Sequence, residues 1–417
     1  MAEDLQDLNE EIEALDLLIE YENELDFPFE IFNYPKLQVL RIVNCERDDL
    51  PNEIIKLKNL THFVFENAKL KQLTTKVGGL NELEYLSLEG NNLVSLPKEI
   101  GQLQNLQVIN LSENNLGGLS KSFLRISQLK KLCLSKNNLS ILPKRFGDLK
   151  SLEILDISYN QLKTLPDSTF QLKNLHSLNL ENNRLNSLPI SIGKLSSIVE
   201  LNLSSTNLKT FPEPIAELIN LRSLILDNNR LDNLPASIEN LSSLERLSLS
   251  STGLETFPET IVHLKNLRNL ILRNNRISSF PTSIRNLIFL ERLDLSSNEL
   301  STFPEMIVQL KNLRSLVLGN NRLSSLPAEI SNLEMLKSLH LSSNKFETLP
   351  QSISQLKNLK FLWLNLNPLQ TIPTNIVGLS NLKWIVLTYY ANFEALRNKI
   401  NFLLPTCKIL GRPIKKH

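Results

Sequence analysis

The chain has 417 residues, and its 45 lysine and arginine residues against 44 aspartate and glutamate residues leave a net charge of +1. This balance provides no long-range field for nucleic acid or an anionic membrane surface, so we expect neither as a partner. The acidic N-terminus lacks the basic start and apolar core of a signal peptide, and no apolar run approaches the length of a membrane span. We therefore expect a soluble cytoplasmic protein without a membrane span.

The three cysteines, Cys45, Cys133 and Cys407, are far apart in the sequence and form no cluster. Clustered pairs of cysteines would indicate a disulfide framework in an oxidising compartment. Their dispersal favours reducing surroundings.

The first part of the chain, residues 1–36, is predicted to close the N-terminal end of the fold. Residues 1 to about 25 have the spacing of an acidic amphipathic helix, whose apolar face would hold Leu5, Leu8, Ile12, Leu15 and Ile19. Such a helix could bind a partner or cover an exposed apolar end, and we favour the cap. The residues from Phe27 to Tyr34 match the second half of the repeat described next, so they form a truncated repeat.

A unit of 23 residues repeats without insertion through residues 37–390. In the unit that begins at Leu313, leucine or isoleucine occupies positions 1, 4, 6, 11, 14, 18 and 21, asparagine position 9 and proline position 15. Fifteen full units begin at Leu37, Leu60, Leu83, Leu106, Leu129, Leu152, Leu175, Ile198, Leu221, Leu244, Leu267, Leu290, Leu313, Leu336 and Leu359, and a partial one follows. Repeats of this kind stack in one dimension, so we expect one elongated domain.

Each unit predicts one strand and one return segment. Positions 3 to 7, such as residues 315–319, alternate apolar and variable residues and predict a short strand, while the segment through Pro327 and Ile330 allows only a turn or short 3₁₀ helix. Stacked units would place the strands in parallel. The fold class is α/β, a right-handed solenoid of horseshoe form with the sheet on the concave face and the turn or 3₁₀ segments on the convex face.

Position 9 is predicted to form a buried ladder of asparagine amides that satisfy backbone groups where the chain leaves the strand. Thr206 and Thr252 replace asparagine with a smaller hydroxyl. Between about residues 198 and 336 the units also alternate in pairs, with Phe211, Phe257 and Phe303 at position 14 of every second unit. Alternating large and small side chains there would let neighbouring layers interdigitate.

Recognition should use the open-face strand positions, because the leucines belong to the core. At position 2, arginine and glutamate alternate between adjacent units, which predicts cross-strand ion pairs, until Lys337, Lys360 and Lys383 follow one another. Position 5 places Ile271, Val317 and Trp363 on the open face, and position 10 adds Arg322. The predicted neighbours of Trp363 are His340, Phe361, Leu366, Trp384 and Tyr389. This aromatic surface is either a protein-binding hot spot or is covered by the terminal cap.

Residues 391–417 are predicted to form the C-terminal cap and tail. The stretch from Asn392 to Leu404 is typical of a short helix, and Pro405 stops it. The following residues, Thr406 to Leu410, can add one last strand, in which Cys407 packs as a small hydrophobic residue.

The units resemble the 23-residue leucine-rich repeats with Leu-Pro-x-x-Ile-x-x-Leu that occur in intracellular Ras-group proteins and in many bacterial proteins, over about residues 27 to 390. The resemblance implies a protein-recognition scaffold, and the ending from Asn392 to Ile409 is similar to the cap of bacterial members. No kinase, GTPase or ubiquitin-ligase domain of such relatives fits in the sequence outside the repeats.

No motif in the sequence indicates catalysis or a cofactor. There is no phosphate-binding Gly-x-x-x-x-Gly-Lys loop, no Cys-x-x-Cys and no His-Glu-x-x-His, and no histidine is predicted on a strand next to Cys133, the one candidate nucleophile. We therefore expect a non-enzymatic, monomeric scaffold without cofactors that binds a protein partner on its concave face, as an intracellular signalling adaptor. The alternative is a bacterial surface or delivered protein that binds host molecules.

Overall fold

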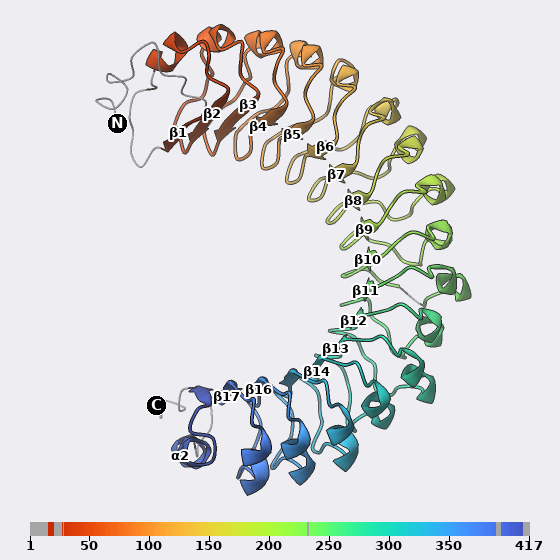
Figure 1. Cartoon of the computed structure of the whole chain (residues 1–417). Coiled ribbons are helices and arrows are strands. Elements are labelled where there is room, and N and C mark those ends of the chain that lie inside the picture. Colours follow the sequence, from red (N-terminus) through yellow and green to blue (C-terminus); the bar gives the residue numbers. More distant parts are fainter. Residues whose placement is uncertain (1–15, 21–26, 28, 232, 389–392, 412–417) are drawn as a thin grey trace. The chain divides into compact units, whose positions relative to one another are not determined.

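The structure is a computed structural model that describes residues 16–20, 27, 29–231, 233–388 and 393–411. The chain divides into two compact units, Met1–Asn207 and Leu208–His417. In each unit the repeats form successive coils, with a parallel sheet along the inner side and 3₁₀ helices along the outer side (Figure 1). The predicted α/β solenoid of leucine-rich repeats is thereby confirmed.

The first unit carries β1 to β9 and η1 to η8. Its strands are β1 (Asp16–Glu20), β2 (Val39–Val43), β3 (His62–Glu66), β4 (Tyr85–Ser87), β5 (Val108–Asn110), β6 (Lys131–Cys133), β7 (Ile154–Asp156), β8 (Ser177–Asn179) and β9 (Glu200–Asn202). Its 3₁₀ helices are η1 (Phe29–Asn33), η2 (Asn52–Lys56), η3 (Thr75–Gly79), η4 (Lys98–Gln102), η5 (Phe123–Arg125), η6 (Phe146–Asp148), η7 (Asp167–Gln171) and η8 (Ile190–Lys194).

The second unit repeats this pattern and ends in a cap. Its strands are β10 (Ser223–Ile225), β11 (Arg246–Ser248), β12 (Asn269–Ile271), β13 (Arg292–Asp294), β14 (Ser315–Val317), β15 (Ser338–His340), β16 (Phe361–Trp363), β17 (Trp384–Val386) and β18 (Lys408–Leu410). Its helices are η9 (Glu213–Glu217), η10 (Ala236–Asn240), η11 (Glu259–His263), η12 (Thr282–Asn286), η13 (Glu305–Gln309), η14 (Ala328–Asn332), η15 (Gln351–Gln355), η16 (Thr374–Gly378) and α2 (Phe393–Leu403).

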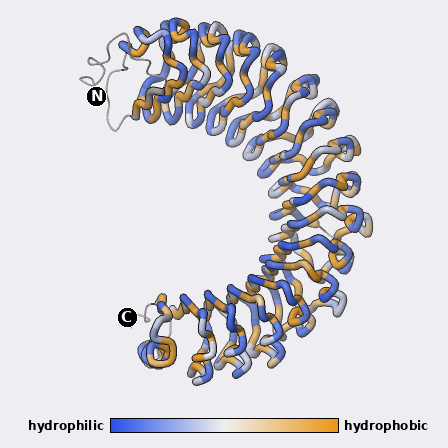
Figure 2. The backbone as a smooth tube through the Cα atoms, in the orientation of Figure 1, coloured by the Kyte–Doolittle hydropathy of each residue, from blue (hydrophilic) through white to orange (hydrophobic). Residues whose placement is uncertain are grey.

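The strict period of 23 residues fixes the register between strands. Val317 lies opposite His340, and His340 lies opposite Trp363, so side chains at one repeat position form a row across the sheet. The leucines of positions 4 and 6 point to the other side and are fully buried, as at Leu316 and Leu318. Figure 2 shows the resulting alternation of hydrophobic and hydrophilic residues along every coil.

The asparagine ladder is confirmed. The Nδ2 atom of Asn321 donates to the carbonyl oxygens of Leu295 at 2.9 Å and Leu318 at 3.0 Å, and its Oδ1 atom accepts from the N–H of Leu300 at 3.1 Å. In the repeat that has threonine in place of this asparagine, the Oγ1 atom of Thr252 donates to the carbonyl oxygen of Leu249 at 2.8 Å. One side chain therefore satisfies buried backbone groups of two adjacent repeats.

Most strands are shorter than the predicted positions 3 to 7. The structure has Ser315–Val317 where the sequence predicts residues 315–319, whereas β2 and β3 extend over five residues. Position 8 lies in the left-handed region, with φ of 55° at Asn320. Asparagine tolerates this conformation. The alternation at position 14 is also incomplete, since Phe280 places a second ring 5.1 Å from that of Phe257.

The prediction of an N-terminal helix is wrong for the described residues 16–20. They form β1, which pairs in parallel with β2, and Ile19 is buried while Leu18 is exposed. A short apolar run does not distinguish helix from strand by periodicity, and pairing satisfies the backbone of the sheet edge. Residues 1–15, which include Leu5, Leu8, Ile12 and Leu15, lie outside the described residues. The truncated repeat is present, with Phe27, Ile31 and Phe32 buried around η1.

The predicted C-terminal helix and last strand are both present. α2 buries Phe393, Leu396 and Ile400, and β18 pairs in parallel with β17. Cys407 is buried, and burial raises the pKa of its thiol to about 11. No helix in the described part of the chain is both long and apolar enough to cross a bilayer.

Candidate functional site

The open sheet face of the second unit carries an aromatic patch, formed by Val317, His340, Phe361, Trp363 and Trp384. The ring of His340 stacks on the ring of Trp363, with centroids 3.4 Å apart and an interplanar angle of 19°. The Phe361 ring lies 5.8 Å from that of Trp363. All five side chains are half-buried, so they are held by their neighbours but keep accessible surface.

The described part of the cap contacts the patch at Trp384. β18 continues the sheet beyond β17, and the Nζ atom of Lys408 lies 5.1 Å from the centroid of the Trp384 ring. A cation above a tryptophan face is a favourable contact. Phe361 and Trp363 keep part of their surface accessible, so the described cap residues do not cover them completely.

His340 is electrically neutral near physiological pH. Burial lowers the pKa of its imidazole to about 4, Asp294 opposes that shift, and Arg292 adds to it. Asp294 lies opposite Val317 in the sheet register. Its carboxylate forms an ion pair with Arg292, with the Nη2 atom of Arg292 3.5 Å from the Oδ2 atom of Asp294. The stacked pair of His340 and Trp363 therefore presents an uncharged surface.

A lysine rim, formed by Lys337, Lys360 and Lys383, borders the patch. Each of these residues immediately precedes a strand: β15, β16 and β17, respectively. Backbone hydrogen bonds connect them across the repeats, because the N–H of Lys360 donates to the carbonyl oxygen of Lys337 at 2.8 Å and the N–H of Lys383 donates to that of Lys360 at 2.9 Å. The ion pairs found among the described residues include none to the lysine rim. The rim therefore adds positive charge along one side of the patch.

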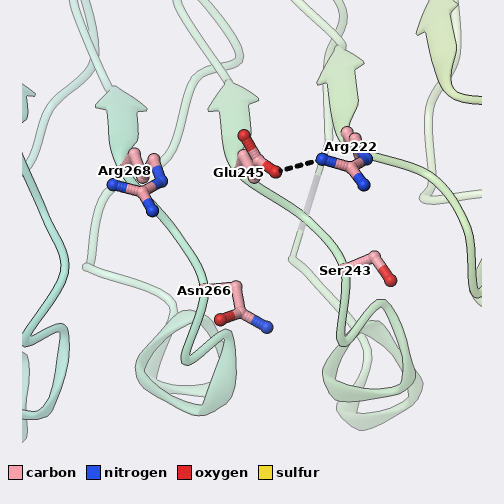
Figure 3. Close-up of a pocket in the computed structure, with 5 residues that line it drawn as sticks. All are labelled: Arg222, Ser243, Glu245, Asn266 and Arg268. Carbon is pink, nitrogen blue, oxygen red and sulfur yellow. Dashed lines mark hydrogen bonds and ion pairs between the residues drawn. The ribbon is translucent and has the colours of Figure 1, made fainter.

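At the same repeat position earlier in the second unit, ion pairs between neighbouring strands neutralise the charged side chains, as predicted. Arg222 pairs with Glu245 at 2.8 Å, and Glu291 pairs with Arg268 at 2.8 Å and with Arg314 at 3.1 Å. A polar pocket of about 240 Å³ lies beside these charges, lined by Arg222, Ser243, Glu245, Asn266 and Arg268 (Figure 3). Its lining lacks an apolar wall to anchor a ligand, so it is a weaker candidate site than the aromatic patch.

Several predicted site residues do not join the patch. Ile271 is separated from Val317 by Asp294 on the intervening strand β13. Arg322 is exposed outside the strand and lies 3.7 Å from Glu299. Leu366 is 49% exposed in a left-handed conformation with φ of 58°, and Tyr389 lies outside the described residues.

Sequence reasoning missed three contributors. Lys408 belongs to the cap, and only the register of β18 with β17 places it on the face of Trp384. Asp294 and Arg292 set the electrostatic surroundings of His340 from two strands away. The repeat period could align Asp294 and Arg292 with the patch, but it could not place Lys408 or show the stacking of His340.

Cys133, the candidate nucleophile, has no histidine beside it in register on the two described neighbouring strands. Its strand neighbours in register are Asn110 and Asp156, neither of which is a histidine. Burial raises the pKa of the Cys133 thiol, which disfavours the reactive thiolate. Within the described ranges, no three His, Cys, Asp or Glu side chains lie together so as to hold a metal ion.

Family models for leucine-rich repeats match several parts of the chain. The model described as "Leucine-rich repeat region" matches residues 125–212, and "Leucine rich repeat" matches residues 81–139, 219–277 and 265–323. A further model, "Leucine Rich Repeat", matches residues 335–356. The comparison with curated proteins gave no match.

Solved structures with the same fold include bacterial and plant proteins. A leucine-rich repeat protein of Leptospira interrogans is 34% identical, with a TM-score of 0.76 and 98% of each chain covered. The ectodomain of the Arabidopsis thaliana receptor kinase GASSHO1/SCHENGEN3, solved with Casparian strip integrity factor 2, is 28% identical with a TM-score of 0.58; 93% of this chain but only 52% of that one is covered. The plant peptide hormone receptor RGFR1, solved with RGF2, is 26% identical with a TM-score of 0.64, covering 93% of this chain and 68% of that one.

Proposed function

This chain belongs to the leucine-rich repeat family, and we propose that it is a non-enzymatic scaffold that binds a protein partner on the concave sheet face of its second unit. The observation that carries the proposal is the aromatic patch on that face. The neighbours RGFR1 and GASSHO1/SCHENGEN3, which were solved with bound partners, support partner binding as the general role.

The composition of the patch favours protein recognition. Tryptophan is enriched among residues that dominate binding energy, and both tryptophans of the chain, Trp363 and Trp384, lie here. Stacking of His340 on Trp363 holds the rings in place before a partner arrives, which lowers the entropy lost on binding.

We propose that the protein acts in the cytoplasm as a signalling adaptor. Two of the cysteines, Cys133 and Cys407, are free thiols, which suits reducing surroundings. The second candidate is a bacterial surface or delivered protein that binds host molecules, and the 34% identical relative from Leptospira interrogans favours it. Fractionation of the source cells separates the two, because only the second predicts the protein outside the cytoplasm.

A pull-down from source-cell extract tests the binding face. The double variant Trp363→Ala/Trp384→Ala should lose partners that wild type retains, because truncating a hot-spot residue costs about 2 kcal/mol or more, roughly a thirtyfold loss of affinity. The matched control is Phe402→Ala, an aromatic truncation at a side chain that is 83% exposed on α2 and lies outside the patch. Equal recovery of all partners by a folded double variant would contradict the proposal.

A further inference from the structure

Resting on the proposed function, we infer that the partner presents an acidic segment to this face. Its carboxylates pair with the lysine rim and Lys408, and an apolar side chain between them packs against His340, Phe361 and Trp363. The inference rests on the charge and shape of the face and commits to a polypeptide as the occupant.

This face carries an excess of positive charge. Among the described residues, positions 3, 5 and 7 of the coils from β14 to β18 contain no aspartate or glutamate. Lys337, Lys360 and Lys383 follow one another along one side, and Lys408 stands at the end. Earlier in the same unit, each arginine at the repeat position of these three lysines forms an ion pair with a glutamate, as Arg222 does with Glu245. A partner that brings carboxylates would supply the pairs that the fold itself provides elsewhere.

The centre of the face favours an uncharged side chain. His340 is neutral and stacked on Trp363, Val317 lies beside His340 in register, and the Phe361 ring lies 5.8 Å from the ring of Trp363. Burying a partner's charge here would cost desolvation without a compensating counter-ion. The segment is therefore acidic at its flanks and apolar in its middle.

The dimensions suit a short extended segment that crosses the strands. From β14 to β18 there are four strand intervals, which at about 4.8 Å each give a span of roughly 19 Å. An extended chain rises about 3.3 Å per residue, so about six residues span the face.

Single-stranded nucleic acid is the other polymer that combines lysine contacts with aromatic rings, but the ring geometry disfavours it. Bases stack on free aromatic faces. Here one face of Trp363 is occupied by His340, and Lys408 lies over Trp384. Because a neighbour already lies over one face of each tryptophan, the patch suits aliphatic and aromatic side chains better than a row of stacked bases.

Intrinsic tryptophan fluorescence gives a site-specific readout, because both tryptophans of the chain belong to the patch. The full-length protein is titrated with the tryptophan-free peptide Glu-Asp-Phe-Leu-Asp-Glu, with Lys-Arg-Phe-Leu-Arg-Lys, with Glu-Asp-Gly-Ser-Asp-Glu, and with oligouridylate. We expect the first peptide to bind at least about tenfold more tightly than the other three. The basic peptide lacks carboxylates for the lysine rim, Glu-Asp-Gly-Ser-Asp-Glu lacks the apolar side chains that pack on the patch, and oligouridylate needs free ring faces for its bases. Tighter binding of oligouridylate or of the basic peptide would overturn the inference.

Charge-reversed variants locate the contact. Lys337→Glu/Lys360→Glu/Lys383→Glu should weaken binding of the acidic peptide by about tenfold or more. The control Lys98→Glu/Lys121→Glu/Lys144→Glu makes the same change in net charge at exposed lysines in three consecutive repeats of the first unit, and it should leave affinity unchanged. Equal affinity of the two variants would overturn the inference. If extract partners still depend on Trp363 and Trp384 but bind the lysine-rim variant normally, the acidic-segment inference fails while the proposed function stands.

Discussion

His340 shows how a neighbour across the sheet changes the chemistry of one residue. A histidine on an open strand position would ordinarily titrate near pH 6.5, yet burial lowers the pKa of His340, whose ring stacks on Trp363, to about 4. Asp294 pulls the pKa the other way, and Arg292 reinforces the shift. The sequence places His340 beside Trp363 but does not show that the histidine behaves as an apolar ring.

This lowered pKa predicts a dependence of stability on pH. Between pH 6.5 and about 4 the unfolded chain binds a proton at His340 that the folded chain does not, so the free energy of unfolding decreases as the pH falls through this window. We expect a loss of about 1–2 kcal/mol between pH 8 and pH 5, less than the full shift implies because the ring is partly exposed to water. Urea unfolding of His340→Phe, which keeps a ring without the titration, should show a smaller loss, and parallel profiles for both proteins would refute the assignment.

At the scale of elements, the repeats were predictable and the N-terminal end was not. A period of 23 residues without insertion fixes the strands, the 3₁₀ helices and the register, because every repeat imposes the same constraint. The segment Asp16–Glu20 has no such redundancy: its apolar residues fit either periodicity, and pairing with β2 decides the outcome. The C-terminal helix was predictable because it combines helical spacing with Pro405 as a stop.

The cap helix α2 gives a prediction about its buried face. Leu396 is 2% exposed, whereas Phe402 on the same helix is 83% exposed. Leu396→Ala should lower the free energy of unfolding by about 2–4 kcal/mol, because it removes buried methyl groups and leaves a cavity. Phe402→Ala should change it by less than about 0.5 kcal/mol. Thermal and urea unfolding followed by circular dichroism measure both, and equal effects would show that α2 is not anchored through this face.

At the scale of the whole molecule, the candidate site is defined by the aromatic and lysine side chains that cluster on one face, and the overall composition and net charge do not reveal it. The net charge of +1 conceals the lysine rim, because acidic residues elsewhere cancel it. Repeat positions identified most of the aromatic patch, since the strict period aligns His340, Trp363 and Val317 in one row. The same alignment places Ile271 in this row, and the structure adds that Asp294 lies between Ile271 and Val317. Lys408 was missed because the cap departs from the period.

The repeat architecture also determines how far a local defect spreads. Asn321→Ala removes an amide that serves Leu295, Leu300 and Leu318, so buried backbone groups lose their partners at a cost of about 2–4 kcal/mol. Because each repeat packs only on its neighbours, hydrogen exchange should accelerate about tenfold or more around β13 to β15 while β3 to β8 keep their wild-type rates. The control Asn312→Ala removes one exposed hydrogen bond, from Nδ2 to the carbonyl oxygen of Ile288 at 2.8 Å, and should change neither region. Uniform acceleration along the whole chain in Asn321→Ala would instead show that the repeats unfold as a single cooperative block.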